Sequence, residues 1–188
     1  GRLPQADKVI DQVRALYPKE PWPWWVRFYL YAMTGRGAAA SAMLEANPTM
    51  HGQPELARMW RASLPAVDQP TPANLAKARD ACIAGAKQSG DLASQGVQIL
   101  SALGQADPAF EIAEGYLLSR GPLVQQGQAG TNQPNATAGW RISTQWMFTP
   151  AATAMRADPR FLPLCQGVGL TDYWRSRGVR PDYMKRQA

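Results

Sequence analysis

Apolar residues recur along the first half of the chain with the period of an amphipathic helix. Within residues 6–17 they are spaced three or four positions apart or lie side by side, at Ile10, Val13, Leu16 and Tyr17. This spacing places them on one face of a helix, which we expect to be buried. Pro18 cannot continue a helix, so the sequence predicts a first helix that ends at Tyr17.

The same pattern predicts six further helices, separated by Pro, Gly and Ser. The second is rich in aromatic residues, and the fifth has Thr71 as its N-cap and Pro72 in its first turn. The expected ranges are 22–34, an Ala-rich segment from about 38 to 47, 53–64, 72–88, 91–103 and 108–119.

Turn residues indicate that these helices form a repeat. Gly35 and Gly104 lie 69 residues apart, close to twice the period of about 34 residues in tetratricopeptide repeats. In that family an aromatic residue precedes a tyrosine by seven positions, and a glycine turn and a helix-B alanine follow. Four residues match these positions: Trp24, Tyr31, Gly35 and Ala40.

Residues 1–120 therefore resemble a degenerate tetratricopeptide (TPR) array. The resemblance implies helical hairpins stacked into a superhelix, whose first helices line a concave surface. A bundle of helices without a repeat is the alternative.

The composition changes after residue 120. Residues 121–139 contain no charged side chain and are rich in Gly, Gln, Asn and Thr. We predict an uncharged loop over residues 121–148. Such a loop either covers a functional site or is simply mobile.

Residues 149–188 are expected to form a C-terminal helical cap and tail. Asp158 would cap a helix that begins at Pro159, with Phe161 and Leu164 on its buried side. Three residues that follow would cover the open hydrophobic end of the array: Leu170, Tyr173 and Trp174.

This segment resembles the C-terminal end of TPR-like regions in bacterial multidomain regulators. The other end of such regulators is often a winged-helix DNA-binding domain or a nucleotide cyclase. The resemblance implies that the chain is a piece of a larger signalling or transcription regulator.

Composition agrees with a helical fold. The 188 residues include 30 Ala and 16 Leu but only 8 Val and 5 Ile, and β-branched residues are those that favour strands. The length suits one domain or a short repeat array. We therefore predict an all-α fold: a TPR-like superhelix of α-α hairpins with a C-terminal helical cap.

The net charge of +6 raises the question of an acidic partner. Much of the excess lies near the C-terminus, at Arg175, Arg177, Arg180, Lys185 and Arg186. A nucleic-acid-binding helical domain that uses this surface is an alternative function. The basic stripe is short, however, which argues against direct nucleic-acid binding.

Catalytic and metal-binding patterns are missing from the sequence. The single histidine, His51, has no neighbouring carboxylate, and Glu111 and Glu114 are the only close glutamate pair. We expect no enzyme activity, no cofactor and no metal. Cys82 and Cys165 are expected to be free thiols, with one disulfide as the alternative.

The aromatic second helix is the candidate binding surface. If first helices line the concave groove, a protein or peptide partner would contact Trp22, Trp25, Tyr29 and Met33. The alternative is that these side chains form the core. A small-molecule sensor pocket between hairpins is a third possible function.

No segment approaches the roughly 18 apolar residues of a membrane span. We expect a cytoplasmic protein, or a periplasmic one if a transmembrane segment precedes it.

Overall fold

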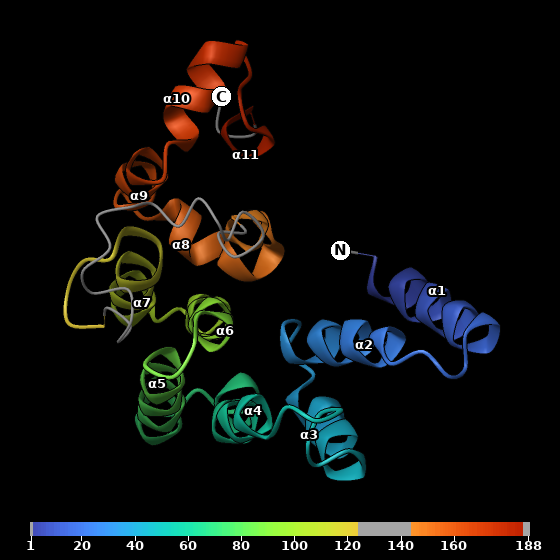
Figure 1. Ribbon diagram of the computed structural model, residues 1–188. Coiled ribbons are helices and arrows are strands. Elements are labelled where there is room, and N and C mark those ends of the chain that lie inside the picture. Colours follow the sequence, from blue (N-terminus) through green and yellow to red (C-terminus); the bar gives the residue numbers. More distant parts are fainter. Residues whose placement is uncertain (1, 124–143, 186–188) are drawn as a thin grey trace.

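The computed structural model describes residues 2–123 and 144–185. Within these ranges every regular element is a helix, so the prediction of an all-α fold is confirmed (Figure 1). The first part of the chain contains seven helices: α1 Leu3–Leu16, α2 Trp22–Ala32, α3 Gly37–Ala46, α4 Pro54–Asp68, α5 Pro72–Ala86, α6 Gly90–Ala102 and α7 Ala106–Leu118.

Capping residues explain where several of these helices begin. The Thr71 hydroxyl accepts a hydrogen bond from the Asn74 amide at 3.2 Å, as expected of an N-cap. The Ser89 hydroxyl caps α6 in the same way, because it accepts a hydrogen bond from the Leu92 amide at 3.2 Å. The first helix starts at Leu3, earlier than predicted, because Pro4 is tolerated in a first turn.

The two turn glycines have matching backbone geometry. Gly35 and Gly104 adopt the left-handed conformation with φ of 73° and 72°. After Gly35 the Arg36 amide donates to the Tyr31 carbonyl, and after Gly104 the Gln105 amide donates to the Leu100 carbonyl. Both turns thus close helices α2 and α6 with the same hydrogen bond over five residues.

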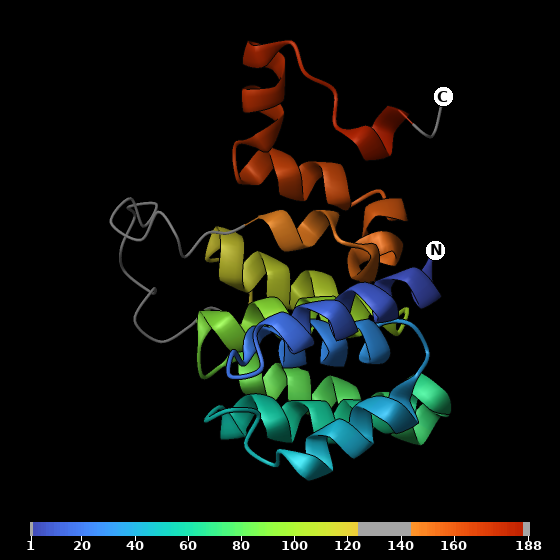
Figure 2. The ribbon, with the colours of Figure 1, turned by 90° about the vertical axis from the view of Figure 1, so that its right-hand side faces the viewer.

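Helices α3 to α7 lie side by side, each against its neighbour along the chain (Figures 1 and 2). Small residues allow close contact between them. A Cβ atom added to Gly96 on α6 would lie 3.3 Å from the Cβ of Cys82 on α5. Cys82 and Cys165 are free thiols, as expected, and both are fully buried.

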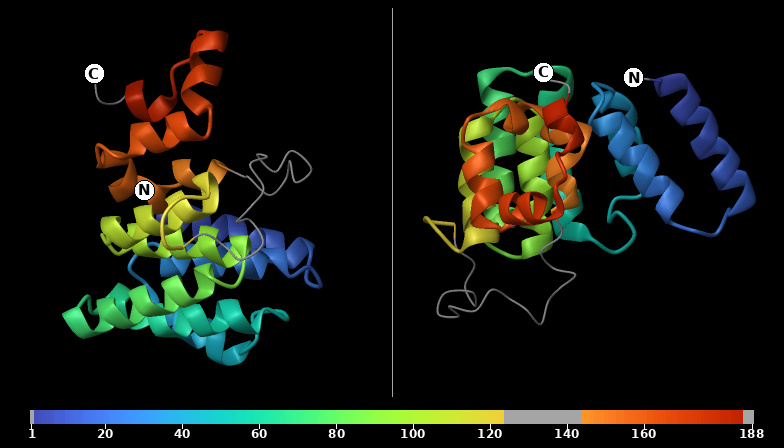
Figure 3. Two further views of the ribbon diagram at one scale, coloured as in Figure 1. Left: turned by 60° about the vertical axis from the view of Figure 1, so that its left-hand side comes forward. Right: turned by 90° about the horizontal axis from the view of Figure 1, so that it is seen from above.

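The α1 and α2 hairpin stands beside this stack (Figure 3). Charged contacts hold α1 in place: Arg27 of α2 pairs with Asp11, and Arg36, just before α3, pairs with Asp7 at 2.8 Å. Ile10 is the buried residue of α1.

The predicted buried face of α1 is only partly correct. Leu16 is 72% exposed and Tyr17 is 54% exposed. Both side chains were expected to be buried. Because α1 packs mainly against α2, a narrow strip of its surface is covered.

The C-terminal part contains short helices: η2 Gln145–Phe148, η3 Pro150–Ala152, α8 Thr153–Ala157, α9 Phe161–Gly167, α10 Leu170–Arg177 and α11 Asp182–Lys185. Most of the expected 121–148 loop lies outside the described residues. At its end, η2 replaces the expected loop with a 3-10 helix. Trp146 and Met147 are buried there, because this turn packs onto α6.

The cap is joined to the helical stack through α6. Met155 on α8 is fully buried, and its amide donates to the buried Ser101 hydroxyl of α6 at 3.2 Å. Phe161 and Leu164 are each 2% exposed, as predicted. Tyr173 is 55% exposed, so its predicted role in covering the array is wrong. Leu170 and the neighbouring Trp174 are half-buried.

Asp158 stabilises the turn before α9 rather than a helix starting at Pro159. Its carboxylate accepts hydrogen bonds from the Arg160 amide and guanidinium, both at 2.9 Å. These bonds with Arg160 lower the pKa of Asp158 to about 2. The helix itself begins two residues later than predicted, at Phe161.

The described ranges contain no helix with the length and the apolar surface that spanning a membrane would require.

Candidate functional site

Two aromatic residues of α2 belong to the core. Phe28 is fully buried and contacts Trp60 of α4 edge-on, with ring centroids 5.2 Å apart. Trp24 stacks on Phe28 at 5.3 Å with nearly parallel planes. Tyr29 also contacts Trp60, with ring centroids 6.0 Å apart, so α2 is fixed against α4 by more than one aromatic side chain.

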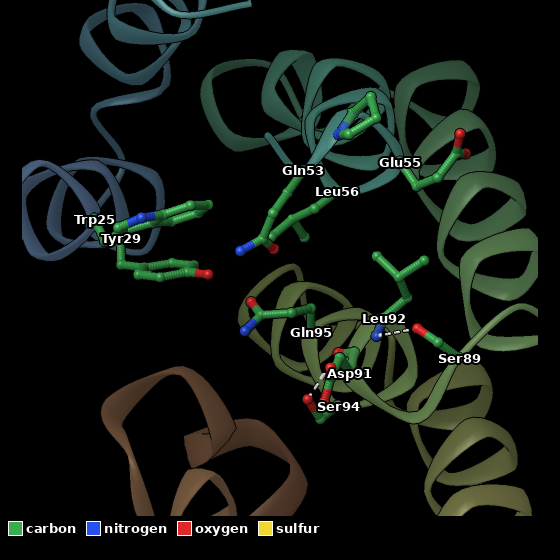
Figure 4. A pocket seen from close by; sticks show the side chains of 11 residues that line it. Trp25, Tyr29, Gln53, Glu55, Leu56, Ser89, Asp91, Leu92, Ser94 and Gln95 are labelled. Carbon is green, nitrogen blue, oxygen red and sulfur yellow. Dashed lines mark hydrogen bonds between the residues drawn. The ribbon is translucent and has the colours of Figure 1, made fainter. Parts of the chain in front are cut away.

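Trp25 and Tyr29 line a groove of about 590 Å³ (Figure 4). Their rings lie one turn apart on α2, with centroids 6.0 Å apart and planes 27° from parallel. Both side chains are half-buried. The two rings form one wall, which faces the beginnings of α4 and α6.

The opposite wall comes from α4 and α6 and from the residues just before them. It combines apolar and polar side chains: Gln53, Pro54, Glu55, Leu56, Ser89, Asp91, Leu92, Ser94 and Gln95. The groove therefore lies among α2, α4 and α6.

Gln95 lies close to the Tyr29 hydroxyl in this groove (Figure 4). Burial raises the pKa of Tyr29 to about 12, although a hydrogen bond with the Gln95 side chain acts to lower it. Tyr29 is therefore protonated at neutral pH. The buried Gln95 Oε1 accepts no hydrogen bond from any described residue.

Both charged residues of the groove wall are acids. Glu55 accepts a hydrogen bond from Arg58, which is one turn further along α4 and does not line the groove. Asp91 forms no ion pair within the described part of the chain. Each acid lies in the first turn of its helix, where the helix dipole stabilises negative charge.

The four residues predicted to bind a partner separate into different environments. Trp25 and Tyr29 share the groove. Trp22 is 46% exposed at the start of α2 and does not line this groove. Met33 lines a separate cavity of about 130 Å³ with Trp60 and Leu103.

Sequence reasoning missed the second wall of the groove. Leu56, Asp91 and Gln95 have no motif of their own, and they are far from α2 along the chain. One repeat period of about 34 residues beyond Trp25 is Met59, which is buried in the core and does not line the groove. The repeat spacing therefore gave no signal for this wall.

The residues considered for catalysis do not come together. His51 is exposed and contacts Trp24 with ring centroids 5.0 Å apart, and it does not line the groove. Glu111 and Glu114 are half-buried on α7. Within residues 2–123 and 144–185, no three His, Cys, Asp or Glu side chains are grouped as metal ligands.

The basic surface near the C-terminus is partly neutralised. Arg175 donates to Asp172 at 2.9 Å, and Arg177 lies 6.0 Å from the centre of the Tyr173 ring. Arg180 is exposed. The Lys185 side chain and all of Arg186 lie outside what the structure describes.

Comparisons with known proteins do not assign the chain to a family. Neither the family models, nor the curated proteins, nor the solved structures that were searched contain a match to it. The groove among α2, α4 and α6 is therefore the basis for a functional proposal.

Proposed function

We propose that this chain is a non-enzymatic protein-interaction module with TPR-like architecture, part of a larger bacterial signalling or transcription regulator. Its partner would be a peptide segment bound in the groove. One observation carries the proposal: Trp25 and Tyr29 on α2 face the starts of α4 and α6 across an open space of about 590 Å³.

The side chains in the groove suit peptide binding. Half-buried Trp and Tyr rings supply large contact areas with little loss of conformational entropy, and such residues dominate binding energy at interfaces. Gln53, Ser94 and Gln95 add amide and hydroxyl groups that can hydrogen-bond a peptide backbone. The groove thus offers both apolar and polar groups to a peptide.

The same chemistry supports binding rather than catalysis. Tyr29 has a pKa of about 12 and holds its proton at neutral pH, so it would not act as a base there. Direct nucleic-acid binding has less support, because Arg175 is paired with Asp172 and the lining of the groove contains no cation.

Selection from a displayed library of random twelve-residue peptides tests the proposal. We expect the chain to enrich peptides whose binding falls at least about tenfold in Trp25→Ala, since an interface aromatic is worth more than about 1.4 kcal/mol. Gln53→Arg places a long side chain in the groove at an exposed position, so it blocks binding without disturbing the core.

Trp22→Ala is the matched control, because Trp22 is on the same helix but outside the groove. Its peptide affinity should equal that of the unchanged chain. The proposal is wrong if no peptide is enriched, or if enriched peptides bind Gln53→Arg as tightly as the unchanged chain.

A further inference from the structure

The lining of the groove differs in charge from the whole chain. The chain has a net charge of +6, yet the charged side chains in the groove are Glu55 and Asp91. The carboxylate of Glu55 is already paired with Arg58. Asp91 therefore presents a negative charge with no cation among the described residues to balance it.

From this arrangement we infer that the bound peptide inserts a basic side chain, arginine in preference to lysine, between the α2 aromatic wall and Asp91. This inference rests on the proposed function, because it names the chemistry of the peptide in the same groove.

Aromatic faces and acceptors together favour a guanidinium group. A planar guanidinium can stack on the rings of Trp25 and Tyr29, and its five N–H donors reach several acceptors at once. Asp91 supplies a carboxylate on the opposite side of the groove. Gln95, which also lines the groove, has a buried Oε1 that accepts no hydrogen bond within the described chain.

The helix dipoles at this place would favour a bound anion, but two acidic side chains of the chain itself already interact with them. The beginnings of α4 and α6 both adjoin the groove, and helix N-termini attract negative charge. Glu55 and Asp91 occupy the first turns of these helices. At α6, the Ser89 hydroxyl also satisfies the Leu92 amide. The groove thus presents acceptors to a ligand.

The test uses the full chain and a peptide enriched by the library selection. Its basic residue is replaced in turn, giving versions with Arg, Lys, Gln and Glu. We expect affinity to fall in that order, with at least about a tenfold loss from Arg to Gln, as for a desolvated cation on an aromatic face. Raising the salt concentration should weaken the Arg peptide more than the Gln peptide.

Variants of the protein test whether Asp91 supplies the negative charge that selects the basic side chain. Asp91→Asn should reduce the preference for Arg over Gln, while Glu45→Gln, an exposed acid on α3 outside the groove, should leave it unchanged. Melting curves of both variants establish that they are folded.

Two results would overturn the inference and leave the proposed function standing: enriched peptides without a basic residue, or an Arg preference that Asp91→Asn does not alter. A preference for Glu over Gln would also overturn it, because it would mean that the helix N-termini attract an anion. If no peptide is enriched, the proposed function and this inference fail together.

Discussion

At the residue scale, two buried thiols and one half-buried tyrosine keep their protons far above neutral pH. Burial raises the pKa of the Cys82 thiol to about 12, although a hydrogen bond with Ser63 acts in the opposite direction. Burial likewise raises the pKa of Cys165 to about 12. Together with Tyr29, these groups lie in places where a negative charge would be costly.

The raised thiol pKa values predict that the protein loses stability at alkaline pH. Unfolded thiols lose their protons near pH 9, whereas the folded ones hold them to about pH 12. The full contribution is therefore present below pH 9 and is lost between pH 9 and 12. Urea denaturation should show a fall of about 1 kcal/mol per pH unit for each thiol in this window.

Cys82→Ala supplies the comparison. It removes one of the two thiols, so the unfolding free energy should decline less steeply with pH than in the unchanged chain. An equal slope in both proteins would mean that the folded thiol titrates like an unfolded one.

The sequence predicted about half of the candidate site at this scale. Trp25 and Tyr29 were identifiable because helical spacing places them on one face of α2. Trp22 lies on the same face, but it is at the exposed start of the helix, where no partner covers it. Asp91 and Gln95 depend on how α6 meets α2, which the periodicity of a single helix does not specify.

At the scale of the elements, most helix boundaries were close to the prediction because Pro, Gly and capping residues set them locally. The end of α4 was wrong, because the helix continues through Pro65 to Asp68 instead of ending at Leu64. Contacts between elements were less predictable. The first helix has the amphipathic pattern of a buried element, but α1 packs mainly on α2, so Leu16 remains exposed. The 3-10 turn at Trp146 has no periodic pattern, and its burial follows from contact with α6.

The cap predicts unequal effects from two aromatic substitutions. Phe161 on α9 is 2% exposed and contacts Phe148 and Tyr183, with ring centroids 6.0 and 5.6 Å away. Phe161→Ala should lower the unfolding free energy by about 3–5 kcal/mol, since a fully buried aromatic is lost. Tyr173→Ala, on the exposed side of α10, should lower it by less than about 1 kcal/mol.

Urea denaturation followed by circular dichroism measures both changes. Similar losses in the two variants would contradict the described packing, because they would require Tyr173 to be as buried as Phe161.

At the scale of the whole molecule, one hydrophobic core extends from α2 through the stack to α9. The apolar packing is continuous from Phe28 and Trp60 at one end to Trp146 and Phe161 at the other. Although the helices follow one another as in a repeat array, the cap folds back onto α6 and α7. This return contact links segments that are distant in the sequence.

A continuous core predicts one cooperative unfolding transition. Helix content by far-ultraviolet circular dichroism and intrinsic tryptophan fluorescence should give the same urea midpoint. Two separated midpoints would indicate that the hairpins and the cap unfold independently, as weakly coupled repeats do.

The central position of α6 has a consequence for how this protein can evolve. One part of the helix supplies Asp91 and Gln95 to the groove, another holds the cap through Ser101, and Gly96 lies against α5. A substitution in α6 therefore alters partner recognition, cap docking and stack packing together. Sequence drift should be slow there and accompanied by compensating changes, whereas exposed positions of α1 such as Leu16 are free to diversify.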